Sequence, residues 1–252
     1  MANRGWGPDV SQDVDDGDRV ASGQGIERRA GALSRRAILD AATEMIDQHG
    51  LQQLTMRRLG TWCGVEAMAL YRYVSGREDL LNGVVDNLID DLYEDQLASR
   101  DAEDGGWQDY LQRVAHGVRA IALEHPQLFP AIATRPPEAP WVRPPLRSLR
   151  WMETFLATLR GFGFNREAAV GVYRSFTTFL LGQLLLEVAA HGAPLSPAMD
   201  AVDGGAPLPL DLQQYPNLLE LAPMLAEDHS LAEFEEALED LLDRIETNTH
   251  TP

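Results

Sequence analysis

Apolar residues recur every three or four positions through most of this 252-residue chain, and no stretch alternates apolar and polar residues as a β-strand does. Serine, threonine and glycine residues at the ends of these stretches are typical of helix caps and stops. The sequence therefore predicts an all-α protein. The expected helices cover residues 34–49, 55–63, 66–73, 75–96, 107–124, 128–134, 146–160, 165–190, 215–227 and 230–246.

The helical pattern is unevenly divided along the chain. Residues 1–32 are rich in Gly, Asp, Ser and Gln with few apolar residues, so we expect a flexible N-terminal arm. Several short helices are then crowded into residues 33–81, and longer helices fill residues 82–252. We expect a small helical domain followed by a larger one.

Charge and cysteine content exclude several classes of protein. The chain holds 39 acidic and 21 basic residues, a net charge of −18, and a single cysteine, Cys63, which excludes intramolecular disulfides. No secretory signal opens the chain, and its longest apolar stretch, residues 176–190, is interrupted by Gln183 and Glu187. These features favour a cytoplasmic protein with no membrane partner.

One segment of this acidic chain has a net positive charge. Residues 28–77 hold eight arginines and only four acidic residues. Because phosphates respond to local charge, this segment is where nucleic acid would bind.

Residues 55–73 have the layout of a helix-turn-helix motif. A helix that begins after Thr55 is followed by a tight turn over residues 63–65 and a short second helix. On that second helix Leu70 points inward, whereas Met68 and Arg72 point away from it. In such motifs the second helix enters the major groove of DNA.

These residues resemble the DNA-binding domain of TetR-family transcriptional regulators. The resemblance rests on Leu54-Thr55-Met56-Arg57-Arg58-Leu59, Gly64-Val65, Leu70-Tyr71-Arg72-Tyr73-Val74, Arg77 and Leu80-Leu81. Later segments are similar to the C-terminal domain of the tetracycline-repressor branch: Trp107-Gln108, His125-Pro126, Thr134-Arg135-Pro136, Gly161-Phe162 and residues 182–187.

The resemblance implies a homodimer that binds a palindromic double-stranded DNA operator through residues 33–81. A small-molecule inducer, bound within residues 82–252, would release the DNA, as expected of a repressor. Arg28 and Arg29 would follow the minor groove or remain in a solvated tail. Arg77 stands where the family usually has lysine, and Trp62 occupies a position that is more often polar. The implied DNA-binding residues are Arg28, Arg29, Thr55, Arg57, Ala67, Met68, Ala69, Tyr71, Arg72, Tyr73 and Arg77.

The inducer of this chain is expected to differ from tetracycline. The two histidines of the tetracycline receptor that hold magnesium and drug would fall at Ala131 and near Tyr93, so neither is kept. We therefore expect no metal and no cofactor. Eleven of the 18 aromatic residues lie between residues 107 and 179, which favours an apolar or aromatic inducer, although such residues also build ordinary cores. The candidate ligand-binding residues are Tyr93, Trp107, His116, Arg119, Phe129, Arg135, Trp151, Phe155 and Phe176.

The last predicted helix has an apolar stripe that must be covered. Its members would join the helix over residues 165–190 in a dimer interface, or would close the core of a single chain. They are Leu231, Phe234, Leu238, Leu241, Leu242 and Ile245.

Two other functions compete with a DNA-binding regulator. An enzyme has little support because the six histidines are scattered and no nucleophile, phosphate-loop or metal motif appears. An acidic helical module that binds a ligand or protein without DNA affinity would fit the net charge, but Arg57, Tyr71, Arg72 and Arg77 argue against it.

Overall fold

The computed structural model describes residues 33–92, 105–134, 141, 143–144, 148–190 and 212–249. These residues form helices joined by turns, and no β-strand occurs among them. The chain divides into two units, Met1–Leu33 and Ser34–Pro252, and every described helix lies in the second. The all-α prediction is confirmed.

The first helices begin and end at the predicted caps. The Ser34 hydroxyl accepts a hydrogen bond from the Ala37 N–H, and the Thr55 hydroxyl accepts one from the Arg58 N–H. Gly50 ends the first helix with a positive φ of 79°. The elements are α1 (Arg35–His49), η1 (Leu51–Gln53), α2 (Met56–Trp62), α3 (Ala67–Leu70) and α4 (Arg77–Leu92).

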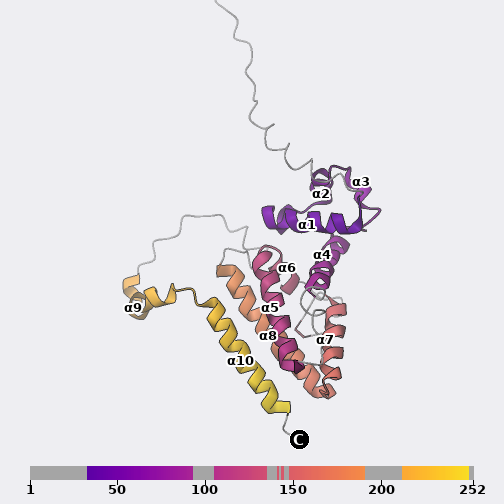
Figure 1. Ribbon diagram of the computed structural model, residues 1–252. Helices are drawn as coiled ribbons and strands as arrows, with labels where there is room; N and C mark the ends of the chain where they lie inside the picture. Colours follow the sequence, from indigo (N-terminus) through magenta and orange to yellow (C-terminus); the bar gives the residue numbers. More distant parts are fainter. Residues whose placement is uncertain are drawn as a thin grey trace, which may run out of the picture. The chain divides into compact units, whose positions relative to one another are not determined.

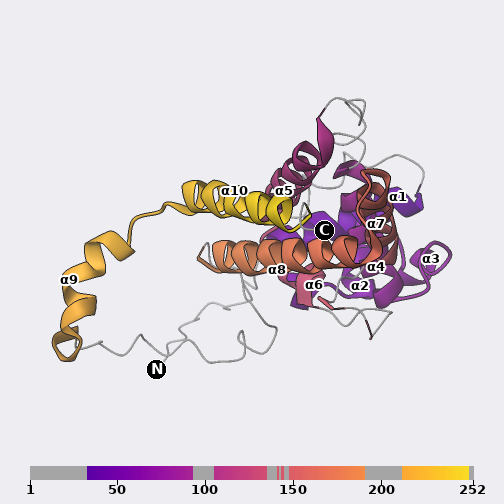
Figure 2. The ribbon, with the colours of Figure 1, turned by 90° about the horizontal axis from the view of Figure 1, so that it is seen from below.

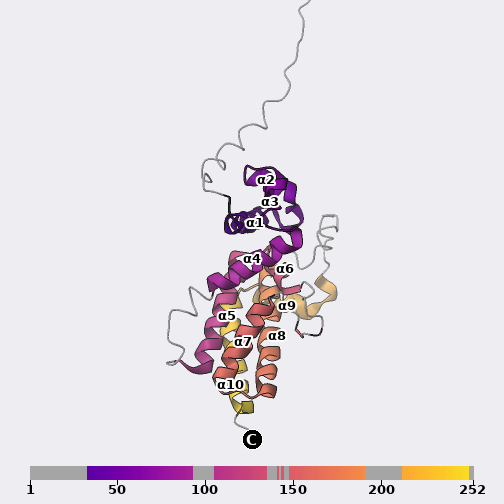
Figure 3. The ribbon, with the colours of Figure 1, turned by 90° about the vertical axis from the view of Figure 1, so that its right-hand side faces the viewer.

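Helix α8 is the centre of the remaining helices. It packs against α5, α6, α7 and α10, and Figures 1 and 3 show these helices grouped around it. The elements here are α5 (Gly106–Glu124), α6 (Phe129–Thr134), α7 (Leu149–Gly161), α8 (Arg166–Ala190), η3 (Leu212–Gln214), α9 (Pro216–Leu225) and α10 (Ser230–Thr249).

The apolar stripe of α10 closes the core of its own chain. Five of its six predicted members are buried in the core cluster that α5, α7 and α8 also supply, while Leu231 is 53% exposed. An amphipathic helix buries its apolar face in this way when it packs over neighbouring helices. The five buried residues are Phe234, Leu238, Leu241, Leu242 and Ile245.

Among the described helices, α8 alone is long and apolar enough to cross a membrane. In this structure it packs on four helices, and its Glu187 carboxylate is buried in an ion pair with Arg119. The helix is therefore the core helix of the bundle.

Helix α9 packs differently from its neighbours. None of its residues is buried, and Figure 2 shows it standing apart from α8 and α10. Exposed apolar side chains cover it and the residue before it. These are Tyr215, Leu218, Leu219, Leu221, Met224 and Leu225.

Helix α4 joins the first helices to the later ones. Arg36 of α1 binds Asp91 at 2.8 Å, while the Ser148 hydroxyl donates to Asp86 at 3.2 Å and Arg150 binds Asp90 at 3.0 Å. The same helix thus contacts α1 on one side and the start of α7 on the other.

Candidate nucleic-acid interface and ligand cavity

Helices α2 and α3 approach each other closely at Gly60. A methyl group at this position would lie 2.9 Å from the carbonyl oxygen of Val65 and 3.0 Å from the nitrogen of Ala67. The Val65 N–H also donates to the Gly60 carbonyl at 2.9 Å. Because both neighbours are backbone, only glycine fits here. Gly60 therefore fixes the angle at which α3 leaves the turn.

Helix α3 presents a small outward face. Leu70 is fully buried, whereas Met68 is 72% exposed and Tyr71, in the turn that follows, is 46% exposed. Arg72 is also exposed, and Ala67, Ala69 and Tyr73 are half-buried. Met68, Tyr71 and Arg72 are thus the predicted DNA-contacting residues of this segment whose side chains are exposed.

Arg57 on α2 and Arg72 after α3 have side chains without a partner among the described residues. Within the described residues, the guanidinium groups of Arg57 and Arg72 are exposed and no hydrogen bond or ion pair involves them. The neighbouring Arg58 instead donates to Gln53, and Thr55 serves as the cap of α2. Unpaired arginines beside an exposed helix are suited to contact phosphates.

The segment after α3 is anchored by Arg35 and Asp79. The Arg35 guanidinium donates to the Tyr73 carbonyl at 2.6 Å and to Asp79 at 2.8 Å, and Asp79 also accepts from the Ser75 N–H at 2.7 Å. The hydrogen bond from Arg35, followed by that from Ser75, lowers the pKa of Asp79 to about 2. The carboxylate is therefore charged at neutral pH and holds the exit of α3 against α1.

Arg77 has a role within the fold. Its Nε and Nη2 atoms donate to the carbonyl oxygens of Leu54 and Leu51, each at 3.2 Å, so it ties α4 to the η1–α2 segment. A planar fork of donors suits two carbonyls better than a lysine ammonium does. Trp62 also has a partner, because its ring packs edge-on against His49 at 5.5 Å.

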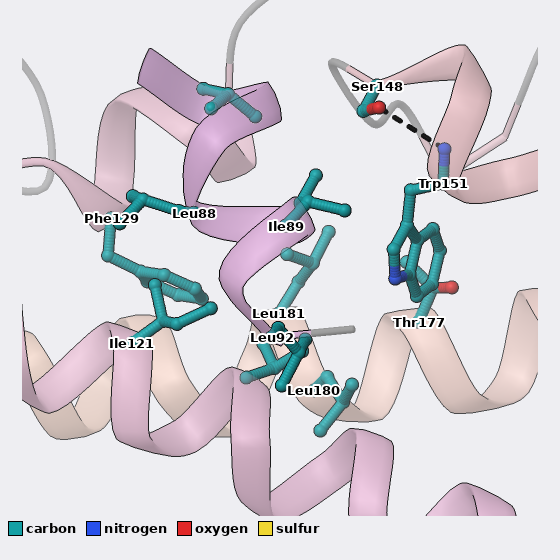
Figure 4. Close-up of a pocket in the computed structure, with 12 residues that line it drawn as sticks. Leu88, Ile89, Leu92, Ile121, Phe129, Ser148, Trp151, Thr177, Leu180 and Leu181 are labelled. Carbon is teal, nitrogen blue, oxygen red and sulfur yellow. Dashed lines mark hydrogen bonds between the residues drawn. The ribbon is translucent and has the colours of Figure 1, made fainter. Parts of the chain in front are cut away.

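A cavity of about 80 Å³ lies between α4, α5, α6, α7 and α8. Figure 4 shows Phe129 and Trp151 on opposite sides of it, with Ile89 and Leu181 between them. None of the described residues that line it is charged. The full lining is Val85, Leu88, Ile89, Leu92, Val118, Ile121, Phe129, Ser148, Trp151, Thr177, Leu180 and Leu181.

The cavity takes in two of the candidate ligand-binding residues, Phe129 and Trp151. Phe155 and Phe176 lie outside its lining, fully buried and stacked on each other at 5.6 Å, so they serve as core. Trp107 packs edge-on against Phe164 at 5.5 Å, also outside the lining.

His116 and Arg119 contact residues of α8 and α10 rather than the cavity. The Arg119 guanidinium binds the buried Glu187 carboxylate through two bonds, of 2.5 and 3.2 Å, and lies 5.5 Å from the Phe234 ring. His116 lies 3.6 Å from Glu235. Both residues therefore join α5 to α8 and α10, apart from the cavity lining.

Several predicted site residues lie outside the described ranges: Arg28, Arg29, Tyr93 and Arg135. Sequence reasoning also missed most of the cavity, because its aliphatic members from α4 and α8 follow the ordinary helical pattern of a core. Within the described ranges, no three His, Cys, Asp or Glu side chains gather closely enough to hold a metal ion.

Known proteins match both parts of the chain. Residues 38–84 match the family model described as "Bacterial regulatory proteins, tetR family", and residues 100–249 match "Tetracyclin repressor-like, C-terminal domain".

Among curated proteins, the HTH-type transcriptional repressor DrrR1 of Streptomyces coeruleorubidus is 29% identical over 150 residues, which is 60% of this chain and 52% of DrrR1. The match to an HTH-type transcriptional regulator of Saccharopolyspora erythraea, 26% identical, covers 62% of this chain and 61% of that protein. The chain thus spans little more than half the length of these relatives.

Solved structures are similar over most of the chain. A possible TetR family transcriptional regulator from Streptomyces coelicolor is 29% identical with a TM-score of 0.62, over 85% of this chain and 99% of the other. The Streptomyces coelicolor TetR family protein ActR, in complex with actinorhodin, is 25% identical with a TM-score of 0.61, over 88% and 99%. Because the two family models together match most of this sequence, the protein belongs to the TetR family of bacterial regulatory proteins.

Proposed function

We propose that this protein is a cytoplasmic transcriptional repressor that binds a palindromic operator as a homodimer and is released by a small, uncharged, apolar inducer. The observation that carries the proposal is the set of exposed side chains on the α2–α3 segment: Met68 on α3, Tyr71 and Arg72 in the turn after it, and Arg57 on α2, with both guanidinium groups unpaired among the described residues. Family membership supports the regulatory role, and neither catalysis nor a cofactor is part of the proposal.

The roles of the individual residues follow from their exposure and partners. Arg57, Tyr71 and Arg72 contact phosphates, while the outward part of Ala67, Met68 and Ala69 faces the bases. Arg77 and the Tyr73 backbone position this surface, because both are engaged in hydrogen bonds within the fold. The net charge of −18 opposes DNA elsewhere on the protein, so binding depends on these few groups.

The cavity beside α4 is the proposed inducer site. A charged ligand would lose its hydration there without gaining an opposite charge, so the apolar wall favours a neutral one. ActR, crystallised with actinorhodin, supports a small-molecule site in a chain of this fold. A ligand larger than the cavity would have to displace some of these lining side chains, and four of them, Val85, Leu88, Ile89 and Leu92, lie on α4.

Coupling between ligand and DNA is proposed to run through α4. Its residues Val85, Leu88, Ile89 and Leu92 line the cavity, while Arg77 at its start holds the η1–α2 segment. If the inducer favours another position of α4, it lowers the affinity for DNA, and DNA lowers the affinity for the inducer by the same factor.

The homodimer is proposed to form through α8 and α9. The outer face of α8 carries exposed Leu186 with the exposed glycines Gly171 and Gly182, and the exposed apolar residues of α9 also require a partner. Surfaces with this much exposed apolar area in a small protein commonly bind another chain.

Selection of binding sites from random duplex DNA with the full-length protein tests the proposal. We expect a two-fold symmetric site whose affinity falls steeply with salt. Arg57→Ala, Tyr71→Ala and Arg72→Ala should weaken binding to that site, whereas Arg244→Ala, at an exposed arginine on α10 outside the proposed dimer surface, should leave it unchanged. Absence of any enriched sequence at low salt, with folded protein, would overturn the proposed function.

A further inference from the structure

The outward side chains of helix α3 are apolar and carry no conventional hydrogen-bonding group. Its exposed residue is Met68, and the residues on either side of it are alanines. None of the three side chains can donate or accept a conventional hydrogen bond. The residue before the helix, Glu66, is exposed and supplies only acceptor oxygens. The part of α3 that would meet base edges therefore has no side-chain donor.

This chemistry selects among the bases. In the major groove guanine presents two acceptors, which are read by donors such as arginine, whereas thymine presents a methyl group that is read by apolar contact. A flexible thioether adapts its shape to such a methyl group. The two alanines allow the helix to come close, and the buried Leu70 on the opposite side holds Met68 outward.

We propose that Met68 is a specificity-determining residue that reads the C5-methyl group of a thymine in each half-site of the operator. The inference rests on the proposed function, since it requires that α3 enters the major groove. In this proposal Arg57 of α2 and Arg72 supply affinity for phosphates, and Met68 supplies the discrimination between thymine and bases that lack the methyl group.

The test uses the DNA site recovered by selection and removes single methyl groups from it. Each thymine is replaced symmetrically by deoxyuridine, and affinities are measured by fluorescence anisotropy with the full-length protein. Loss of one buried methyl group lowers affinity about fourfold per half-site, so about fifteenfold when both half-sites are changed. We expect this loss at one thymine position. A cytosine placed there should bind better when it is 5-methylated.

The variant Met68→Ala ties the effect to this side chain. It should bind the thymine site about as weakly as the wild type binds the deoxyuridine site, and it should no longer distinguish the two. Met68→Leu keeps an apolar group at the same place and should retain the distinction. Because Met68 is 72% exposed, both variants are expected to fold. The salt dependence should be unchanged in Met68→Ala and reduced in Arg72→Ala.

The outcomes separate the two proposals. If no sequence is enriched, the proposed function itself fails. If a site is enriched but deoxyuridine has no effect at any position, or has the same effect in Met68→Ala as in the wild type, the role of Met68 is wrong and the regulator remains.

Discussion

The imidazole of His125 lies 2.8 Å from the carboxylate of Asp47, and this pair joins the end of α5 to α1. Burial by itself lowers the pKa of His125, but the hydrogen bond to Asp47, with the charges of Asp47 and Glu124, outweighs burial and raises the pKa above 6.5. The pair therefore links α1 to α5, one of the helices that line the cavity.

The His125 pair should make stability depend on pH near neutrality. Because its pKa is raised on folding, the pair contributes fully below about pH 6.5, and the contribution is lost as pH rises through the raised value. His125→Gln should lower the free energy of unfolding more at pH 6 than at pH 8.5, as measured by urea titration. His229→Gln, which removes an exposed pair with Glu227, is the matched control and should change little. Equal effects at both pH values would contradict the prediction.

Asp79 should show the opposite dependence. Its pKa is lowered from 3.8 to about 2, so its contribution is present above pH 3.8 and is lost as pH falls toward 2. Because the pair with Arg35 is partly exposed, we expect Asp79→Asn to cost about 1 kcal/mol at pH 7. It should also weaken DNA binding, since Tyr73 and Ser75 lose their anchor. Asp40→Asn, at an exposed i,i+4 pair, serves as control, and an equal loss of DNA binding there would argue against anchoring.

Gly60→Ala should destabilise the α2–α3 unit by about 1–3 kcal/mol, because the added methyl group meets backbone atoms that cannot move aside alone. Gly161→Ala at the end of α7 meets nothing within 4 Å and should leave stability unchanged or slightly raised. Thermal unfolding of both variants measures the difference. Similar melting temperatures for the two would show that α3 can shift without cost.

We expect a large loss in the free energy of unfolding when one partner of the Arg119–Glu187 pair is removed. Glu187→Gln leaves the half-buried guanidinium without its opposite charge and should cost about 3 kcal/mol. The double variant Arg119→Met with Glu187→Leu replaces both charges with apolar groups, so it should recover most of the loss. Urea titrations of the two variants give the values. A double variant no more stable than Glu187→Gln would mean that the ion pair itself stabilises the core.

Two valines one turn apart on α5 test the cavity. Val118 lines it, whereas Val114 is fully buried outside its lining. Val118→Phe should keep stability within about 1 kcal/mol by filling empty space, and Val114→Phe should lose about 1–3 kcal/mol by overpacking. If an inducer is known, Val118→Phe should also abolish the response while DNA binding persists. Equal losses of stability in the two variants would mean that the cavity cannot accept added volume.

Local chemistry made the helices predictable. Ser34, Thr55 and Gly50 cap or end helices through hydrogen bonds and dihedral angles that involve only a few neighbouring residues, so their roles can be read from short segments. The same holds for the outward face of α3, which follows from Leu70 pointing inward.

Contacts between distant residues could not be predicted in this way. Trp151 and Phe155 are both predicted ligand-binding residues and both are buried on α7, yet only Trp151 lines the cavity, because that depends on the gap left by α4 and α8. Likewise, Arg119 looked like a polar ligand contact until the structure brought Glu187, 68 positions along the chain, against it. Periodicity indicates which residues face inward and not which of them leave space between them.

Substitutions along α4 should fall into two classes with different effects on gene expression, according to their position on the helix. Substitutions at its first turn, at Arg77 or Asp79, would disturb the segments next to the proposed DNA-binding surface and should give constitutive expression of the regulated genes. Substitutions two to four turns later, at Val85, Leu88 or Ile89, alter the cavity wall. They should give repressors that keep the regulated genes repressed at every inducer concentration. A mutational scan of this one helix would sort its positions into the two phenotypes along about 20 Å of chain.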